Sequence, residues 1–161
     1  PAGADTGRMR KIAFITVLIA ALAAAAPASG ATMLAKSCSN SCSSFSANGK
    51  GWVSIVANGA EWGTISSGTI WMRDRTGKSN PRNWVHGSGL HWKYLGRDGW
   101  KVWSTKTMTV SASTKFWIKL QGSGICVSGV FDGSGTIGGS GTYTINGHKH
   151  SWPGVNTQLQ F

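Results

Sequence analysis

The glycines constrain the fold of this chain more than any other feature. There are 23 Gly in 161 residues, and from Gly51 onward they separate short apolar or alternating runs. A glycine inside a helix costs about 1 kcal/mol relative to alanine, and no segment after Ala26 carries apolar residues at helical spacing over two turns. The glycines lack a three-residue period, which excludes collagen. The chain is therefore expected to consist of short strands.

The clearest strand pattern lies in residues 115–121. Phe116, Ile118 and Leu120 point to one face of an extended segment, because side chains alternate with a period of two. The other face of that run carries Lys115, Trp117, Lys119 and Gln121. Further short runs recur roughly every 8–12 residues, a spacing typical of all-β domains. We expect an all-β fold, a small antiparallel β-sandwich or barrel of jelly-roll-like form.

Short turn signals separate these runs. Pairs that tolerate positive φ predict tight hairpin turns, and they are Asn58-Gly59, Asp98-Gly99, Asp132-Gly133 and Asn146-Gly147. A Ser-Gly-Thr sequence also recurs at 67–70, 134–137 and 140–143. Its unequal intervals indicate no regular repeat. The close second pair leaves a short β-solenoid-like turn near the C-terminus as a minority alternative.

The N-terminal part reads as an export signal. Arg10 and Lys11 precede an apolar stretch over residues 12–26, and small residues close it at 27–31. This is the layout of a secretory signal peptide, and the apolar stretch is shorter than the ~20 residues of a membrane-spanning helix. Residues 1–31 are therefore interpreted as upstream residues plus a signal peptide starting at Met9. We expect a Ser-rich flexible lead-in over 32–50, a single β domain over 51–161, a secreted or cell-wall-associated location, and no transmembrane anchor after cleavage.

Three cysteines remain after cleavage. Disulfides persist outside the cell, so Cys38, Cys42 and Cys126 are candidates for one bridge with one thiol left over. A local Cys38–Cys42 loop and a longer link from either residue to Cys126 both stay open. Because Ile125 and Val127 flank it, we interpret Cys126 as a small buried hydrophobic residue.

Two segments carry a family resemblance, residues 69–74 (TIWMRD) and 115–147. Their pattern resembles a group of small secreted actinobacterial-type β-rich proteins of uncharacterised function. The matching positions are Phe116, Ile118, Leu120, Gly122, Gly124, Ile125, Val127, Ser128, Gly133, Gly135, Gly141 and Tyr143. The resemblance implies a secreted β-rich architecture. It implies no catalytic or binding residue.

Acidic residues are scarce. The chain has 16 Lys+Arg against 5 Asp+Glu, a formal net charge of +11. The acids beyond residue 31 are Glu61, Asp74, Asp98 and Asp132, and no two share one strand face as a glycosidase's paired carboxyls would. We therefore expect a protein that is not an enzyme and has no cofactor.

Metal binding has one weak candidate pair. His148 and His150 stand two apart, so in a strand they would share a face, with His86, His91 or Asp132 as a further ligand. Two ligands alone do not make a site, and no metal is expected.

Cations stand beside aromatic residues in several runs. Indole rings offer flat apolar surfaces, and lysines attract anions. The candidate binding residues are Trp117, Lys115, Lys119, Trp92, Lys93, Trp100 and Trp103. They predict a secreted non-catalytic domain that binds an anionic cell-envelope or extracellular polymer or polysaccharide. Nucleic acid is not the expected partner of a secreted protein. The alternatives are a structural or protein-interaction factor whose Trp residues are internal and, ranked last, a small hydrolase.

Overall fold

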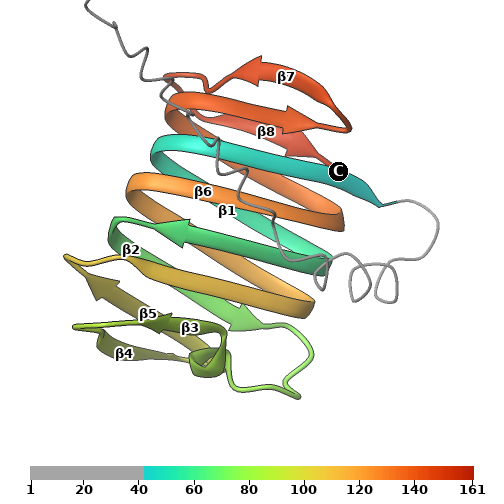
Figure 1. Cartoon of the computed structure of the whole chain (residues 1–161). Coiled ribbons are helices and arrows are strands. Elements are labelled where there is room, and N and C mark those ends of the chain that lie inside the picture. The colour runs from blue at the N-terminus through green and yellow to red at the C-terminus, as the bar shows by residue number, and fades with distance from the viewer. Residues whose placement is uncertain (1–41) are drawn as a thin grey trace, which may run out of the picture.

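The computed structural model describes residues 42–161, a part of the chain built almost entirely of strands (Figure 1). The strands are β1 (Ser43–Ile65), β2 (Ser67–Asp74), β3 (Val85–Gly87), β4 (His91–Gly96), β5 (Gly99–Ser104), β6 (Met108–Ile145), β7 (His148–Ser151) and β8 (Thr157–Gln160), with a 3₁₀ helix η1 (Pro81–Trp84). Every ladder between them is antiparallel. The all-β, sandwich-like prediction is confirmed, and the sheet is not closed into a barrel. Within residues 42–161, no helix has the length and apolarity to span a membrane.

Two very long strands organise the molecule. Val53 of β1 pairs with both Leu120 and Ile137 of β6, and Phe131 of β6 pairs with both Ser43 and Gly59 of β1. Each long strand therefore lies between two passes of the other. The chain of β6 takes roughly 17 residues, or about 55 Å of extended chain, to return to the same residue of β1. Figure 1 shows the result as ribbons wound into a flattened coil.

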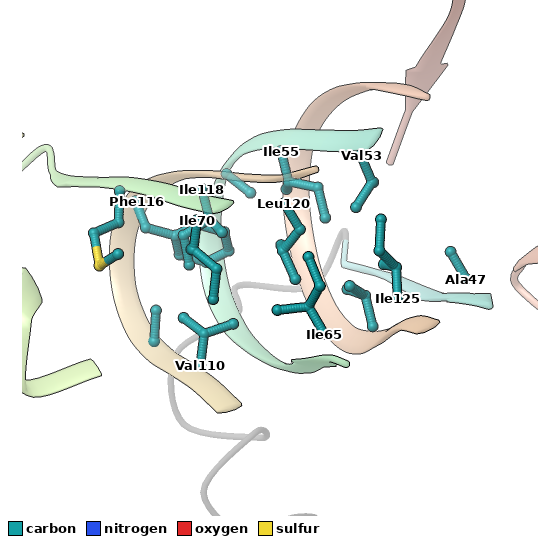
Figure 2. Close-up of a cluster of buried hydrophobic side chains, with 14 of the residues drawn as sticks. Ala47, Val53, Ile55, Ile65, Ile70, Val110, Phe116, Ile118, Leu120 and Ile125 are labelled. Carbon is teal, nitrogen blue, oxygen red and sulfur yellow. The ribbon is translucent and has the colours of Figure 1, made fainter. Parts of the chain in front are cut away.

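The coil has two layers, which we call front and back. The front layer contains residues 52–58 of β1, residues 115–121 of β6, and β2, β5 and β4, in the order β1-β6-β2-β5-β4. The back layer contains residues 43–50 and 60–65 of β1, residues 108–113, 125–130 and 140–145 of β6, and β3. Apolar side chains of both layers fill the space between them (Figure 2). Those that are fully buried include Val53, Ile55, Ile65, Ile70, Phe116, Ile118, Leu120 and Ile125.

Two of the four predicted hairpin turns are wrong. Asn58-Gly59 lies inside β1 and Asp132-Gly133 lies inside β6, because each glycine bends a strand that continues past it. The Asn146-Gly147 turn between β6 and β7 is confirmed, and both residues have positive φ. The turn between β4 and β5 is centred on Arg97 and Asp98, one residue earlier than predicted. The two close Ser-Gly-Thr copies lie in succession on β6 and pair only in antiparallel fashion.

The predicted boundary of the Ser-rich lead-in is also wrong. Residues 43–50 form the first part of β1, and Phe45 and Ala47 are buried. These two residues alternate with serines, so the strand has a period of two that the polar composition hides. The predicted signal peptide and residues 32–41 of the lead-in fall outside the described residues.

A row of four glycines crosses the sheet where the coil turns from one layer to the other. Gly139 pairs with Gly51, Gly51 with Gly122, and Gly122 with Gly68. Their φ values are +134°, +137°, +156° and +145° for Gly139, Gly51, Gly122 and Gly68, a region that residues with a Cβ avoid. A Cβ on any of them would overlap a carbonyl oxygen of the neighbouring strand. The row therefore lets four adjacent passes bend at the same place.

Replacing one member of this row should destabilise the whole coil. Gly122→Ala combines an unfavourable φ with overlap onto Ser67 backbone, so we expect a loss of about 3 kcal/mol or more in the free energy of unfolding. Urea denaturation measures the loss. Gly154→Ala is the matched control, because a Cβ there meets nothing within 4 Å. Equal unfolding free energies for the two variants would contradict the role of the row.

One carboxyl group is enclosed in the core. Glu61 of β1 is 2% exposed, and neither of its carboxylate oxygens has a hydrogen-bond partner within residues 42–161. Its cross-strand neighbours, Ala112 and Gly129, are small. Burial raises the pKa of Glu61 from 4.5 to about 8, because the charged form loses its hydration. The side chain is therefore protonated at neutral pH.

The buried carboxyl of Glu61 should make the free energy of unfolding fall as pH rises. Between pH 4.5 and 8 the folded state holds a proton that the unfolded state has released, so stability falls by about 1.4 kcal/mol per pH unit. Glu61→Gln should remove that slope and exceed the wild type in stability at pH 9, as measured by urea denaturation from pH 5 to 9. Asp132→Asn makes the same carboxyl-to-amide change at an exposed position and should keep the slope. Parallel curves for wild type and Glu61→Gln would show that the carboxyl is not buried in solution.

Candidate functional site

Alternation along β6 places a charged and aromatic stripe outward on the front layer. Phe116, Ile118 and Leu120 are fully buried, so the residues between them point away from the core, as the sequence predicts. Lys115 is exposed, and Trp117 and Lys119 are half-buried. The Trp117 Nε1 donates to the Ser54 hydroxyl at 3.1 Å, which fixes that indole against β1.

Lysines and indoles alternate across the front layer in what we call the Trp–Lys ladder: Trp52, Lys119, Trp71, Lys101 and Trp103. The Lys119 Nζ lies 5.3 Å from the ring centroids of both Trp52 and Trp71. The Lys101 Nζ lies 5.4 Å from those of both Trp71 and Trp103. Each ammonium is therefore placed between two aromatic rings. Such contacts contribute about 0.5–1 kcal/mol each at exposed sites.

Cross-strand register produces the ladder. Trp71 of β2 stands directly opposite Lys119 of β6 on one side and Lys101 of β5 on the other. Beyond β5, Lys93 of β4 stands directly opposite Lys101, and His91 opposite Trp103. The His91 and Trp103 rings stack with 5.6 Å between centroids. The aromatic and basic face thus extends over five strands.

The seven predicted binding residues divide between two faces. Lys115, Trp117, Lys119, Lys93 and Trp103 lie on the outer front face. Trp92 and Trp100 do not join them, because Trp92 pairs with the buried Val102 and both indoles pack against the core. These two rings instead hold the Arg82 guanidinium, whose Cζ lies 5.1 and 5.0 Å from their centroids.

Three members of the ladder were not among the predicted residues: Trp52, Trp71 and Lys101. Each alternates with a buried neighbour, Trp52 with Val53, Trp71 with Ile70, and Lys101 with Val102. That alternation could have placed each on an outer face. It could not have shown that strands so far apart in sequence bring them into one row.

Two of the four acids are turned into the protein, while Asp98 lies in the turn between β4 and β5 and Asp132 is exposed on β6. Asp74 is 3% exposed and accepts hydrogen bonds from the backbone and hydroxyl of both Thr76 and Ser79. Burial alone would raise the pKa of Asp74, but these hydrogen bonds outweigh it and lower the pKa to about 2. Its carboxylate therefore organises the loop after β2. Glu61 is enclosed in the core.

The back layer presents a different outer surface. Its outward positions are mostly uncharged, including Ser44, Ser46, Asn48, Thr64, Thr109, Ser111, Ser113, Ser128, Thr142 and Thr144. Trp62 is exposed there at 47%, without a lysine beside it in the pairing register. The ladder is therefore a property of one face.

Two of the three cysteines lie in the described part. Cys42 is in a disulfide and Cys126 is a free thiol, so neither of the longer links to Cys126 is formed. Cys38 falls outside the described residues. The interpretation of Cys126 as a core residue is wrong, because Ile125 and Val127 point inward and Cys126 lies half-buried on the outer back face.

The histidine pair occupies the edge hairpin. His148 and His150 on β7 are both exposed, and His150 stacks on Tyr143 with 4.9 Å between centroids. His86 lies on β3 and His91 on β4, at the other end of the sheet. Within residues 42–161, no three His, Cys, Asp or Glu side chains gather as metal ligands.

Comparison with known proteins adds no further assignment. No family model matches the chain, and neither the curated proteins nor the solved structures give a match. The resemblance to small secreted actinobacterial-type proteins therefore stays a prediction. The site must be interpreted from its own geometry.

Proposed function

We propose that this protein is a secreted, non-catalytic domain whose front face binds an anionic polymer of the cell envelope or extracellular space. The observation that carries the proposal is the concentration of unpaired cations on that face. Lys93, Lys101, Lys115, Lys119 and Arg73 lie there, and none forms an ion pair with a carboxylate within residues 42–161. Like charges on one surface attract a partner of opposite charge and raise its local concentration.

The positions of the front-face lysines lower the stability of the sheet. Lys93 and Lys101 are directly opposite each other on adjacent strands, and like charges in that position are destabilising. A carboxylate at either position would relieve the repulsion, but a lysine occupies both. A bound polyanion would supply the missing negative charge.

A purely structural role accounts for less of this pattern. Lysines on edge strands prevent sheets from joining edge to edge, which could explain Lys93 on the edge strand β4. It does not explain Lys119 and Lys101, because β6 and β5 are interior strands of the sheet order. The position of these two residues favours binding over the alternative of a structural factor.

Neutralising the ladder should weaken binding to a polyanion. The double variant Lys101→Gln/Lys119→Gln is expected to lose about tenfold or more in affinity for purified bacterial cell wall at low salt, and to reduce the salt slope by about two. Sedimentation of the wall with bound protein, repeated from 0.05 to 0.5 M salt, measures both quantities.

The matched control is Lys50→Gln/Lys149→Gln. It removes the same charge from exposed positions on β1 and β7 that pair with Ser140 and Thr144, away from the ladder. It should retain affinity within about twofold. If both double variants bind alike, or if wild-type binding is unchanged by salt, the proposal fails.

A further inference from the structure

The contacts inside the Trp–Lys ladder limit what a ligand can touch. Lys119 and Lys101 reach Trp71 from the two strands that flank β2. Trp103 contacts Lys101 and also stacks on His91. The faces of these indoles are therefore engaged by the protein's own side chains. A sugar ring or a base could stack on Trp71 only after displacing a lysine.

The ammonium groups, in contrast, keep their hydrogen-bonding capacity. An ammonium has three N–H donors, and a neighbouring ring attracts it by charge without accepting those donors as an oxygen would. Within the described part of the chain, neither Lys101 nor Lys119 donates to a carboxylate or a hydroxyl.

The ladder thus holds its cations in a line across the strands. The Nζ atoms of Lys119 and Lys101 lie 5.3 and 5.4 Å from the centroid of the same Trp71 ring. The two Nζ atoms therefore can be no farther apart than the sum of these two distances. Lys93 continues the line on β4, one strand beyond Lys101. Adjacent strands are about 4.8 Å apart. A ligand that meets all three lysines must run across the strands from β6 to β4.

Resting on the proposed function, we propose that the ligand is a linear polyanion that runs across the strands and is bound through its oxyanions, without ring stacking. Lysine binds an oxyanion as a point charge, and its ammonium imposes no planar geometry on the acceptor. The line consists of Lys119, Lys101 and Lys93, and the only arginine on the outer front face is Arg73 among the described residues. Rings in the polymer backbone are unnecessary, since lysines of the protein already contact the indoles of the ladder.

Three polymers of matched chain length separate charge from ring recognition. Inorganic polyphosphate has phosphates and no rings, poly-L-glutamate has carboxylates and no rings, and polygalacturonate has a carboxylate on every sugar ring. Isothermal titration of the full chain should show that all three polymers bind and that the two ring-free polymers bind at least as tightly as polygalacturonate. The two carboxylate polymers should agree within about threefold.

The possible failures are distinguishable. Polygalacturonate binding tightest would establish a ring-stacking mode and overturn the inference while leaving the proposed function intact. The dependence of affinity on salt concentration, determined for each polymer, shows whether a difference in affinity follows only from the number of charges that the protein engages. Absence of binding to all three and to cell wall would reject both proposals.

A tryptophan substitution provides a second readout. Trp103→Leu removes one indole that positions Lys101, so the affinities for all three polymers should fall by a similar factor of about two to five. Trp62→Leu, at an exposed indole on the back face, should change none of them. A loss confined to polygalacturonate would mean that Trp103 stacks on sugar, which contradicts the inference.

Discussion

Close approach between backbones at the glycine row is the constraint on which the rest of the structure depends. A strand of 38 residues cannot remain extended in a small protein, and β6 is kept compact by bending while it stays paired. Bending four adjacent passes at one place requires positive φ and no Cβ at each crossing. Gly139, Gly51, Gly122 and Gly68 meet that requirement. The two layers and the core between them follow from this bend.

The same winding separates the two outer surfaces chemically. Residues 52–58 and 60–65 belong to one strand, yet the first run faces outward on the front and the second on the back. Aromatic and basic side chains gather on the front, while serines, threonines and asparagines predominate on the back. Charge is thereby concentrated on one face of the coil, and the interior strands carry part of it.

Sequence patterns predicted the layers better than they predicted the connections. The period of two in residues 115–121 correctly separates core from surface, and Asn146-Gly147 correctly ends β6. Asn58-Gly59 and Asp132-Gly133 have the same local chemistry but lie within strands, because the backbone pairing on both sides prevents the chain from reversing there. Alternation placed Trp117 and Lys119 on the same outer face of their strand. The partnership of Trp52 with Lys119 depends on register between β1 and β6, which no local pattern contains.

Pairing of β1 on both of its edges has a consequence for how the chain folds. Phe45 pairs with Gly129 and Ile145, so the first strand is completed only by the far end of the sixth. Nearly all of the sheet joins residues distant in sequence, and such contacts close slowly because the intervening chain must be ordered first. Folding of this molecule should therefore be late and cooperative, with β1 unable to hold its final position until almost all of the chain is available.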